Sequence, residues 1–248
     1  MKVAVSGAAG RMGTLVVETI RTAPDLELGG VFDPSAAEGT GISTDPEVVR
    51  GADVVVEFTV PEVVMTNLDR WRAMGVHAVV GTSGFTEGRV AEVRRAWGSG
   101  PPNCLITPNF SIGAVLMMRF AELAAPHFAA AEVIELHHDQ KADAPSGTAV
   151  NTAGRIAAAK PDQQRRVESA ELIEGVRGAD VDGVAVHGIR LPGLLAHQEV
   201  LFGNDGELLT IRHDTSDRKS FMAGVLLAVR NVGQLPGVTV GIEGLLGL

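Results

Sequence analysis

The sequence of 248 residues contains no tyrosine and a single cysteine, and aromatic residues make up only 4% of it. One cysteine excludes an internal disulfide framework and a zinc site built from several cysteines. Cys104 lies in an apolar stretch, so we expect it to be a core residue. No apolar run reaches the roughly 18 residues of a membrane span, and the N-terminal segment turns glycine-rich too early for a signal peptide. These absences favour a cytoplasmic protein.

Positive charge is also scarce: the chain has 21 lysines and arginines but 30 aspartates and glutamates, which gives a net charge of −9. A chain this acidic is not expected to bind nucleic acid or an acidic membrane surface. An anionic ligand would need a local cationic pocket. The hydrophobic content of 45% is ordinary for a soluble globular protein, while the 30 glycines indicate many tight turns.

The first half of the chain alternates short apolar strands with helices of amphipathic spacing. Strands are expected at residues 2–6, 26–33, 53–59, 77–82 and 103–108, and helices at 11–22, 61–75 and 86–98. This alternation predicts an α/β fold of the Rossmann type, with a parallel sheet covered by helices on both faces.

The pattern changes after about residue 108. Helices are expected at residues 112–128, 146–160 and 217–233, a strand at 132–138, and three further strands at 184–191, 197–203 and 207–214. Residues 161–183 are polar and weakly patterned, which indicates a surface loop. The order predicts a nucleotide-binding domain followed by an α+β domain with a mixed or antiparallel sheet. The last helix is expected to pack back on the first domain.

A glycine-rich turn joins the first strand to the first helix at residues 7–13, "GAAGRMG". Gly7 permits the tight turn, small residues let the backbone approach a pyrophosphate, and Gly13 permits close helix–strand packing. Asp33 follows the second strand, where an acid suits a ribose 2′-hydroxyl and disfavours the 2′-phosphate of NADP. Arg11 lies close enough in sequence to offset that charge, so the choice between NADH and NADPH stays open. A tight turn without a ligand is the alternative interpretation.

Two later strand ends are predicted to line the same crevice, because ligands bind beyond the carboxyl ends of parallel strands. They are Gly81-Thr82-Ser83-Gly84 and Thr107-Pro108-Asn109-Phe110. Each could equally be an ordinary turn.

Residues 135–149, "ELHHDQKADAPSGTA", combine two histidines and a lysine with a helix start. A nicotinamide delivers hydride but no proton, so a reductase needs a nearby acid and cations for an anionic substrate. His137, His138 and Lys141 supply both. Ser146 is a plausible N-cap, and the helix start with the hydroxyls of Ser146 and Thr148 suits a carboxylate. The segment therefore predicts a pocket for a small anion such as a dicarboxylate.

Other interpretations of this segment are weaker. A metal site from His137, His138, Asp139 and Asp143 would have poor spacing for one ion. A serine hydrolase triad with Ser146 lacks the G-x-S-x-G elbow. A purely structural role remains an alternative. The lack of tyrosine excludes the Tyr-xxx-Lys chemistry of short-chain dehydrogenases, so the acid in a reduction would be histidine or lysine.

Six stretches together resemble the 4-hydroxy-tetrahydrodipicolinate reductase (dihydrodipicolinate reductase) family, nearly from end to end. They are "VAVSGAAGRMG", "EFTVPE", "GTSGF", "TPNFSIGAVLM", "ELHHDQKADAPSGTA" and "DRKSFMAGVLLAV". The histidine–lysine string is highly specific to the family, and "IRLPGLLAHQEVLFG" resembles its actinobacterial members. The resemblance implies a Rossmann-like domain at residues 1–107 and 216–248. It implies a substrate domain at 108–215 whose mixed sheet builds a homotetramer.

The resemblance also implies the reaction, the reduction of 4-hydroxy-tetrahydrodipicolinate to tetrahydrodipicolinate with loss of water, in lysine and diaminopimelate biosynthesis. The cofactor would be NADH or NADPH. By matched position, His137 is the proton donor and acceptor, Lys141 a proton donor, and His138, Gly147 and Thr148 contact the substrate carboxylate. The matched cofactor contacts are Gly7, Ala8, Ala9, Gly10, Arg11, Met12, Asp33, Gly81, Thr82, Ser83, Thr107, Pro108, Asn109 and Phe110, with Arg218 near the cofactor.

The chain departs from the family pattern at two places. Ala9 stands where some relatives carry a basic residue, which shifts the expected preference modestly toward NADH. "LPGLL" replaces a more common sequence in the substrate domain. Two alternatives remain: another two-domain nicotinamide oxidoreductase acting on a small anionic substrate, and a protein that senses NAD(P)H without chemistry. The histidine–lysine cluster argues against the sensor, which needs no proton donor.

Overall fold

The computed structural model describes residues 1–160 and 169–248 of the chain. The chain divides into two compact units, one formed by Met1–Ser111 with Phe221–Leu248 and the other by Ile112–Ser220. The domain boundaries expected after residues 107 and 215 lie within five residues of this division. Each unit has its own sheet and its own apolar core.

The first unit contains a six-stranded sheet in which all neighbouring strands are parallel, in the order β11-β5-β4-β3-β1-β2. The strands are β1 (Lys2–Ser6), β2 (Glu27–Phe32), β3 (Val54–Glu57), β4 (His77–Val80), β5 (Cys104–Ile106) and β11 (Val238–Val240). The central strands are almost wholly buried, which explains their continuous apolar sequence. Cys104 is a buried core residue, as expected.

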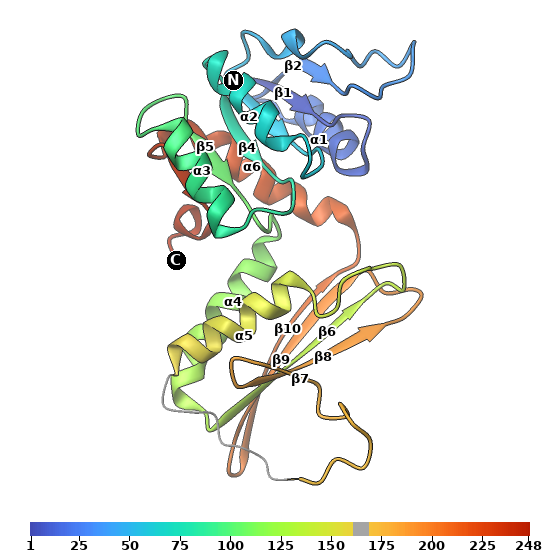
Figure 1. Ribbon diagram of the computed structural model, residues 1–248, viewed down its shortest axis with the longest axis vertical. Coiled ribbons are helices and arrows are strands. Elements are labelled where there is room, and N and C mark those ends of the chain that lie inside the picture. The colour runs from blue at the N-terminus through green and yellow to red at the C-terminus, as the bar shows by residue number, and fades with distance from the viewer. Residues whose placement is uncertain (161–168) are drawn as a thin grey trace. The chain divides into compact units, whose positions relative to one another are not determined.

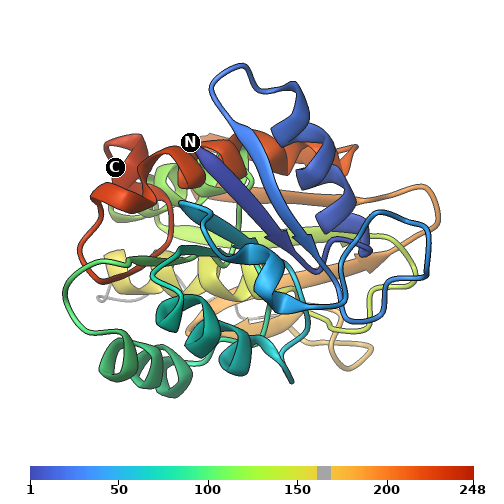
Figure 2. The ribbon, with the colours of Figure 1, turned by 90° about the horizontal axis from the view of Figure 1, so that it is seen from above.

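Helices cover both faces of this sheet. They are α1 (Arg11–Thr22), α2 (Val64–Ala73), α3 (Glu87–Trp97) and α6 (Met222–Asn231). Figures 1 and 2 show α1 and α6 on one face and α2 and α3 on the other. Trp71 of α2 is fully buried and meets the ring of Phe32 edge-on, with the ring centroids 6.0 Å apart. The predicted Rossmann-like fold is confirmed.

Two elements of this unit differ from expectation. The helix expected from Pro61 begins only at Val64, because the N–H groups of Val63 and Val64 both donate to the carbonyl of Val60 at 3.2 Å and close a turn first. β11 was not predicted. Its three residues form a strand through parallel pairing with β5, which a local sequence pattern cannot indicate.

The second unit contains a mixed five-stranded sheet in the order β10-β9-β6-β8-β7. The strands are β6 (Ala130–His137), β7 (Ala179–Val181), β8 (Val184–Arg190), β9 (Ala196–Asn204) and β10 (Glu207–Thr215). β6 and β8 are parallel, and the other pairs are antiparallel. Helices α4 (Ile112–Ala124) and α5 (Gly147–Ala159) pack together on one face of the sheet (Figure 1). The expected α+β domain with a mixed sheet is confirmed.

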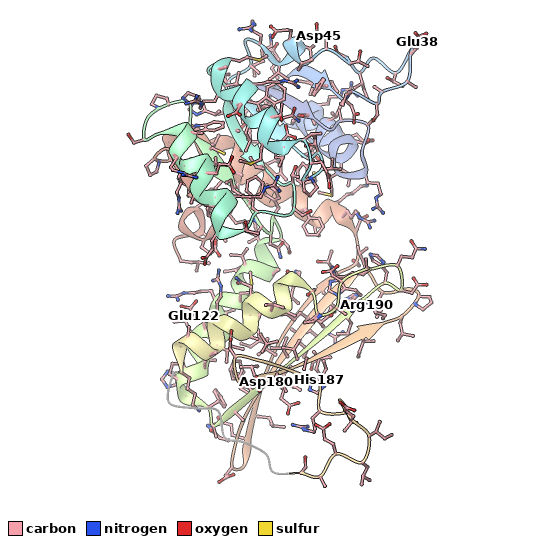
Figure 3. All side chains as sticks on the ribbon, viewed as in Figure 1. Glu38, Asp45, Glu122, Asp180, His187 and Arg190 are labelled. Carbon is pink, nitrogen blue, oxygen red and sulfur yellow. The ribbon has the colours of Figure 1, made fainter. Side chains whose placement is uncertain are left out.

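The other face of this sheet carries polar side chains at its centre. Glu132 of β6 accepts a hydrogen bond from Nε2 of His187 on β8 at 2.8 Å, and it also pairs with Arg177. Figure 3 shows His187 and Arg190 at two levels of β8. The loop expected at residues 161–183 is wrong at 179–181, which form β7 through antiparallel pairing with β8; residues 161–168 lie outside the described residues. Within the described part of the chain, no helix is long and apolar enough to cross a membrane.

Candidate active site

The glycine turn of the first unit runs from β1 into α1. Gly7 has a φ of 81°, and a Cβ there would lie 2.3 Å from the carbonyl oxygen of Phe58. A Cβ on Gly13 would lie 2.1 Å from the carbonyl oxygen of Gly7. The chain therefore requires both glycines for its own packing. Gly10 caps α1 without a side chain, so the N–H groups of the first turn remain available to an anion such as a pyrophosphate.

Asp33 lies against this turn. Its Oδ2 accepts from the N–H of Ala9 at 3.0 Å, and its Oδ1 accepts from the N–H and the hydroxyl of Ser35 at 2.9 and 2.6 Å. Burial opposes ionisation, but the hydrogen bonds from Ser35 and Ala9 outweigh it and hold the pKa of Asp33 below its ordinary value. Asp33 is thus a charged group that organises the glycine turn, with lone pairs left for a ribose hydroxyl.

The other predicted strand ends lie at the same edge of the sheet. Gly81 follows β4, and a Cβ there would lie 2.2 Å from the ring of Phe58 and 2.7 Å from that of Phe110. The two phenylalanine rings pack with centroids 5.5 Å apart. The turns after β1, β3, β4 and β5 are therefore brought together through Gly7, Phe58, Gly81 and Phe110. Thr107, which follows β5, is buried, and its hydroxyl has no hydrogen-bond partner among the described residues.

Arg218 is placed differently from the other predicted cofactor residues. It lies in a short 3-10 helix, Arg218–Phe221, at the end of the second unit. It is therefore not part of the compact unit that holds the glycine turn.

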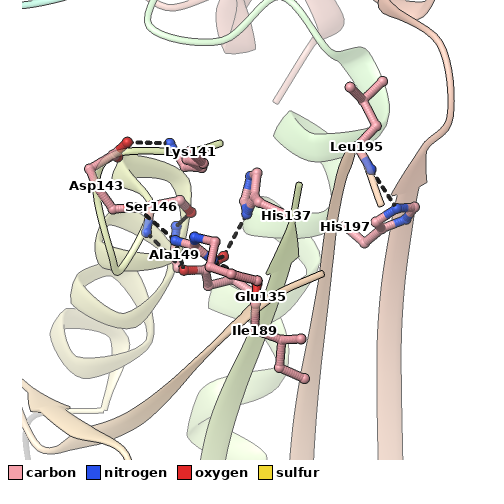
Figure 4. A network of polar contacts seen from close by, with 10 residues as sticks. Glu135, His137, Lys141, Asp143, Ser146, Ala149, Ile189, Leu195 and His197 are labelled. Carbon is pink, nitrogen blue, oxygen red and sulfur yellow. Dashed lines mark hydrogen bonds and ion pairs between the residues drawn. The ribbon is translucent and has the colours of Figure 1, made fainter. Parts of the chain in front are cut away.

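In the second unit, the predicted proton donor His137 is the last residue of β6, and its ring Nδ1 lies 2.5 Å from Oε2 of Glu135 (Figure 4). The two side chains share a face of the strand because they are two residues apart. Glu135 is fully buried. Burial lowers the pKa of His137 and the Glu135 carboxylate opposes this shift. The positive charges of Lys141 and Arg190 add to the lowering.

Arg190 closes the other side of Glu135. It is the last residue of β8, directly opposite His137 in the parallel pairing with β6. Its two terminal nitrogens donate to Oε1 and Oε2 of Glu135, each at 2.8 Å, in a bidentate pair. Nη2 also donates to the carbonyl of Asp143 at 2.6 Å. Although burial raises it, the pKa of Glu135 is held below its ordinary value by the hydrogen bonds from Arg190 and His137.

Lys141 lies in the loop between β6 and α5. Its ammonium group pairs with Oδ1 of Asp143 at 2.6 Å, and its N–H donates to the carbonyl of His138 at 3.2 Å. This tight turn brings Lys141 back toward the end of β6. The hydrogen bond from Lys141, followed by its charge, holds the pKa of Asp143 below its ordinary value. His138 follows the strand directly and is half-buried.

The start of α5 contains the residues that were predicted to bind an anion. Ser146 caps the helix, since its hydroxyl accepts from the N–H of Ala149 at 3.2 Å, and its own N–H donates to Oε1 of Glu135 at 3.3 Å. The N-cap expected at Ser146 is confirmed. Gly147 and Thr148 form the first turn. Apart from its own helix backbone and chain neighbours, a Cβ on Gly147 would meet none of the described residues within 4 Å, so internal packing does not require glycine there.

Two of the alternatives considered for this segment, the hydrolase triad and the metal site, can be compared with its geometry. The Ser146 hydroxyl is engaged in capping, and His137 takes its carboxylate from Glu135 rather than from Asp143, so no hydrolase triad forms. Within residues 1–160 and 169–248, no three histidine, cysteine or acidic side chains converge as a metal site would need.

Glu135 and Arg190 were missed by sequence reasoning. A signal for Glu135 existed, because it is an acid on the core-facing side of an apolar strand, two residues before His137. Arg190 gave no comparable signal, since its position beside Glu135 depends on the register between β6 and β8.

Comparison with known proteins gives one consistent result. Models of the dihydrodipicolinate reductase family match this chain in two parts, the N-terminal model over residues 1–110 and the C-terminal model over residues 113–246. The chain is 53% identical to 4-hydroxy-tetrahydrodipicolinate reductases of Mycobacterium sp. (strain KMS) and Nocardia farcinica. It is covered completely in both alignments, which span 100% and 99% of those proteins.

Among solved structures, the dipicolinate-bound dihydrodipicolinate reductase from Paenisporosarcina sp. TG-14 is similar over 98% of both chains. The TM-score is 0.85 at 37% identity. A scyllo-inositol dehydrogenase from Lactobacillus casei has a TM-score of 0.61 at 12% identity, which reflects the fold alone.

Proposed function

Because this chain belongs to the dihydrodipicolinate reductase family, we propose that it reduces 4-hydroxy-tetrahydrodipicolinate to tetrahydrodipicolinate with loss of water. The full-length identity of 53% to named reductases carries this conclusion. The chain is an NAD(P)H-dependent oxidoreductase of lysine and diaminopimelate biosynthesis. In the net reaction, the substrate gains one hydride and one proton and loses one water molecule.

The residues of the first unit fit a nicotinamide dinucleotide. The uncapped start of α1 suits its pyrophosphate, and the buried Thr107 hydroxyl, which lacks a partner among the described residues, lies where the strand ends meet. When bound, the cofactor supplies the hydride. We assign the remaining contacts to the residues at these turns: Gly7 to Met12, Asp33, Gly81 to Ser83 and Thr107 to Phe110. Arg218 is proposed as a further cofactor contact.

The choice between NADH and NADPH is proposed to depend on Asp33. Its ionised carboxylate holds the N–H of Ala9, and it repels a 2′-phosphate placed beside the same turn. Arg11 follows two residues after Ala9 and offsets part of this repulsion. We therefore propose that NADH is used at least as well as NADPH.

The second unit is proposed to bind and protonate the substrate. Lys141 and His137 are the catalytic proton donors. His138, Ser146, Gly147 and Thr148 hold a carboxylate, through the helix start and through charge. The dipicolinate-bound relative supports this assignment, since dipicolinate is a planar dicarboxylate that resembles the substrate ring.

A coupled assay tests the activity. The purified chain is combined with a dihydrodipicolinate synthase that supplies substrate, and oxidation of NADH and NADPH is followed near 340 nm. Oxidation above background with at least one cofactor is expected. No oxidation with either cofactor would refute the reductase and leave the sensing protein as the better interpretation.

The role of Lys141 is tested by substitution. Lys141→Ala is expected to lose turnover by about 100-fold or more, the usual contribution of a general acid, while its NADH affinity stays unchanged. The matched control is Lys2→Ala, an exposed lysine of β1. Near-normal turnover in Lys141→Ala, or loss of cofactor binding, would contradict the assignment.

We also propose that four copies assemble through the second sheet. α4 and α5 cover one face of it, while Leu208 of β10, which points to the other face, is 80% exposed. Light scattering is expected to give about four times the chain mass of 25.9 kDa. Leu208→Glu should lower that mass, whereas the control Leu172→Glu, at another exposed leucine, should not. A monomer in the unsubstituted protein would refute the assembly. We expect a cytoplasmic location, where reduced nicotinamide cofactors are supplied.

A further inference from the structure

The Glu135 carboxylate of the second unit takes part in four hydrogen bonds, yet it has no role in the proposed reaction. It is fully buried at the centre of the sheet. Oε2 faces His137 Nδ1 and one Arg190 nitrogen, while Oε1 faces the other Arg190 nitrogen and the Ser146 N–H. One carboxylate therefore touches three elements: β6, β8 and the start of α5.

We propose that Glu135, held in place by Arg190, is a positioning residue that fixes the tautomer and orientation of His137 and aligns the start of α5 with it. This inference rests on the proposed function, in which His137 handles a proton. It adds to that function by identifying Glu135 and Arg190 as the residues that hold His137 in the tautomer and orientation needed for proton transfer.

The tautomer follows from the chemistry of the contact. An ionised carboxylate only accepts hydrogen bonds, so the nitrogen that faces it must carry the proton. His137 Nδ1 lies 2.5 Å from Oε2 of Glu135 and is therefore protonated. In the neutral ring, Nε2 then holds the lone pair and exchanges protons on the side away from Glu135.

Arg190 makes this arrangement possible inside the protein. A buried carboxylate without a cation is costly, and it would tend to take the proton from His137 or fix a positive charge on it. The bidentate Arg190 pair compensates the Glu135 charge with two hydrogen bonds of 2.8 Å. Gly188 on β8 leaves room for the Glu135 carboxylate, since a Cβ there would lie only 3.2 Å from Oε1 of Glu135.

The same two side chains link the proton donor to the anion site. Arg190 donates to the carbonyl of Asp143 in the loop before α5, and Glu135 accepts from the N–H of Ser146 at the cap. Movement of His137 and of the helix start is therefore coupled through one carboxylate. This coupling distinguishes Glu135 from an ordinary buried ion pair.

Several charged groups face His137, and their signs give a test. Glu135 from its own strand raises the pKa of His137, while Arg190 from β8 and Lys141 from the loop lower it. His138 follows His137 in the chain and Asp143 pairs with Lys141. On β9 and β10, His197 and Asp214 form a separate pair at 2.6 Å.

The decisive variants are Glu135→Gln and Arg190→Gln. In Glu135→Gln, the amide nitrogen must replace one of the two oxygens. At the Oε1 position it would face two groups that cannot accept, the Ser146 N–H and Arg190 Nη2. At the Oε2 position it would face only one such group, Arg190 Nη1, together with His137, which can accept by moving its proton to Nε2. Glu135→Gln should therefore convert His137 to the Nε2–H tautomer and lower its pKa, whereas Arg190→Gln should raise that pKa.

The measurement is NMR of the full chain with isotope-labelled histidine. The chain has seven histidines, and His137→Gln assigns the signal. The matched control is Glu132→Gln, because Glu132 lies on the same strand and also holds a histidine and an arginine, but on the other face. It should leave the tautomer and pKa of His137 unchanged.

Kinetics provide a second readout. Glu135→Gln should lower kcat by on the order of 100- to 10,000-fold. Loss of a carboxylate that orients a functional histidine typically costs up to about 100-fold, and a catalytic histidine in the wrong tautomer costs about 10,000-fold. The KM for NADH should change little. Arg190→Lys keeps the charge but not the fork, so its His137 pKa should lie between those of the parent and Arg190→Gln.

Two results would overturn the proposal. One is an unchanged tautomer and pKa of His137 in a folded Glu135→Gln protein. The other is a shift of the pKa in the same direction in Glu135→Gln and Arg190→Gln. If Glu135→Gln does not fold, Arg190→Gln and Arg190→Lys decide, and an unchanged His137 pKa in both refutes it. The NMR result stands even if no reductase activity is found, so failure of this inference and failure of the proposed function are distinguishable.

Discussion

Gly147→Ala separates ligand binding from folding at the start of α5. Gly147 is the first residue of the helix, and its φ is not in the left-handed region. Beyond the local backbone, a Cβ there would meet no atom within 4 Å in the part of the chain that the structure describes. Alanine should therefore fit without strain. Because glycine loses more conformational entropy on folding, the change should stabilise the chain by about 0.4–1 kcal/mol.

The added methyl group would lie where a carboxylate is proposed to approach the first-turn N–H groups. Those hydrogen bonds need about 2.9 Å between nitrogen and oxygen, which a methyl beside them disturbs. We expect the affinity for pyridine-2,6-dicarboxylate to fall at least tenfold, about 1.4 kcal/mol. Calorimetric titration in the presence of NADH gives the affinity, and scanning calorimetry gives the melting temperature.

The matched control is Gly154→Ala in the interior of the same helix. A Cβ on Gly154 would make only ordinary contact, 3.6 Å from Oδ2 of Asp182. It should raise stability by up to about 1 kcal/mol without changing the affinity. If Gly147→Ala were more stable but bound the dicarboxylate as tightly as the parent, the helix start would not be the carboxylate contact.

Three further predictions concern other parts of the chain. Asp33→Asn should weaken NADH binding in calorimetric titration, because an amide cannot accept from both Ala9 and Ser35 as the carboxylate does; unchanged binding would contradict a role for Asp33 in ordering the turn. Trp71→Phe should cost about 2–4 kcal/mol in chemical denaturation, since it removes buried volume and the 2.8 Å bond to the buried Glu57, and a cost below about 1 kcal/mol would contradict this. Burial lowers the pKa of three histidines from 6.5, so the unfolded chain binds more protons, and the melting temperature should fall as pH drops below about 6.5; a flat profile between pH 7 and 5 would contradict it. These histidines are His77, His137 and His213.

The first unit could be predicted in most of its elements because its strands are buried on both faces and read as apolar runs. The unpredicted strand of this unit, β11, was missed for the same reason as β7 in the second unit. β11 is a strand only because it pairs with β5, and β7 is a three-residue edge strand with mostly exposed residues. Neither has a pattern of its own, since pairing between distant segments determines both.

The candidate site shows the same division. His137, Lys141 and Ser146 lie within one segment, so local spacing was enough to predict a cluster with a helix cap. Arg190 comes from a later strand, and only the parallel register of β6 and β8 places it opposite His137. The residues proposed to handle substrate were visible in the sequence, whereas Arg190, which compensates the charge of Glu135, was not.

The two helix starts that are proposed to bind anions differ in how their backbones are held, and this decides which experiments are informative. At α1, Gly7 and Gly13 are required because a Cβ added there would lie only 2.3 and 2.1 Å from backbone oxygens, so alanine would disturb folding and cofactor binding together. At α5, Ser146 and Glu135 fix the backbone, and a Cβ at Gly147 would meet no described residue within 4 Å beyond the local backbone. Loss of activity in a variant of Gly7 or Gly13, before and in α1, therefore cannot be assigned to loss of binding. A variant of Gly147 at the start of α5 allows that assignment, so the proposed roles in substrate recognition can be tested one residue at a time.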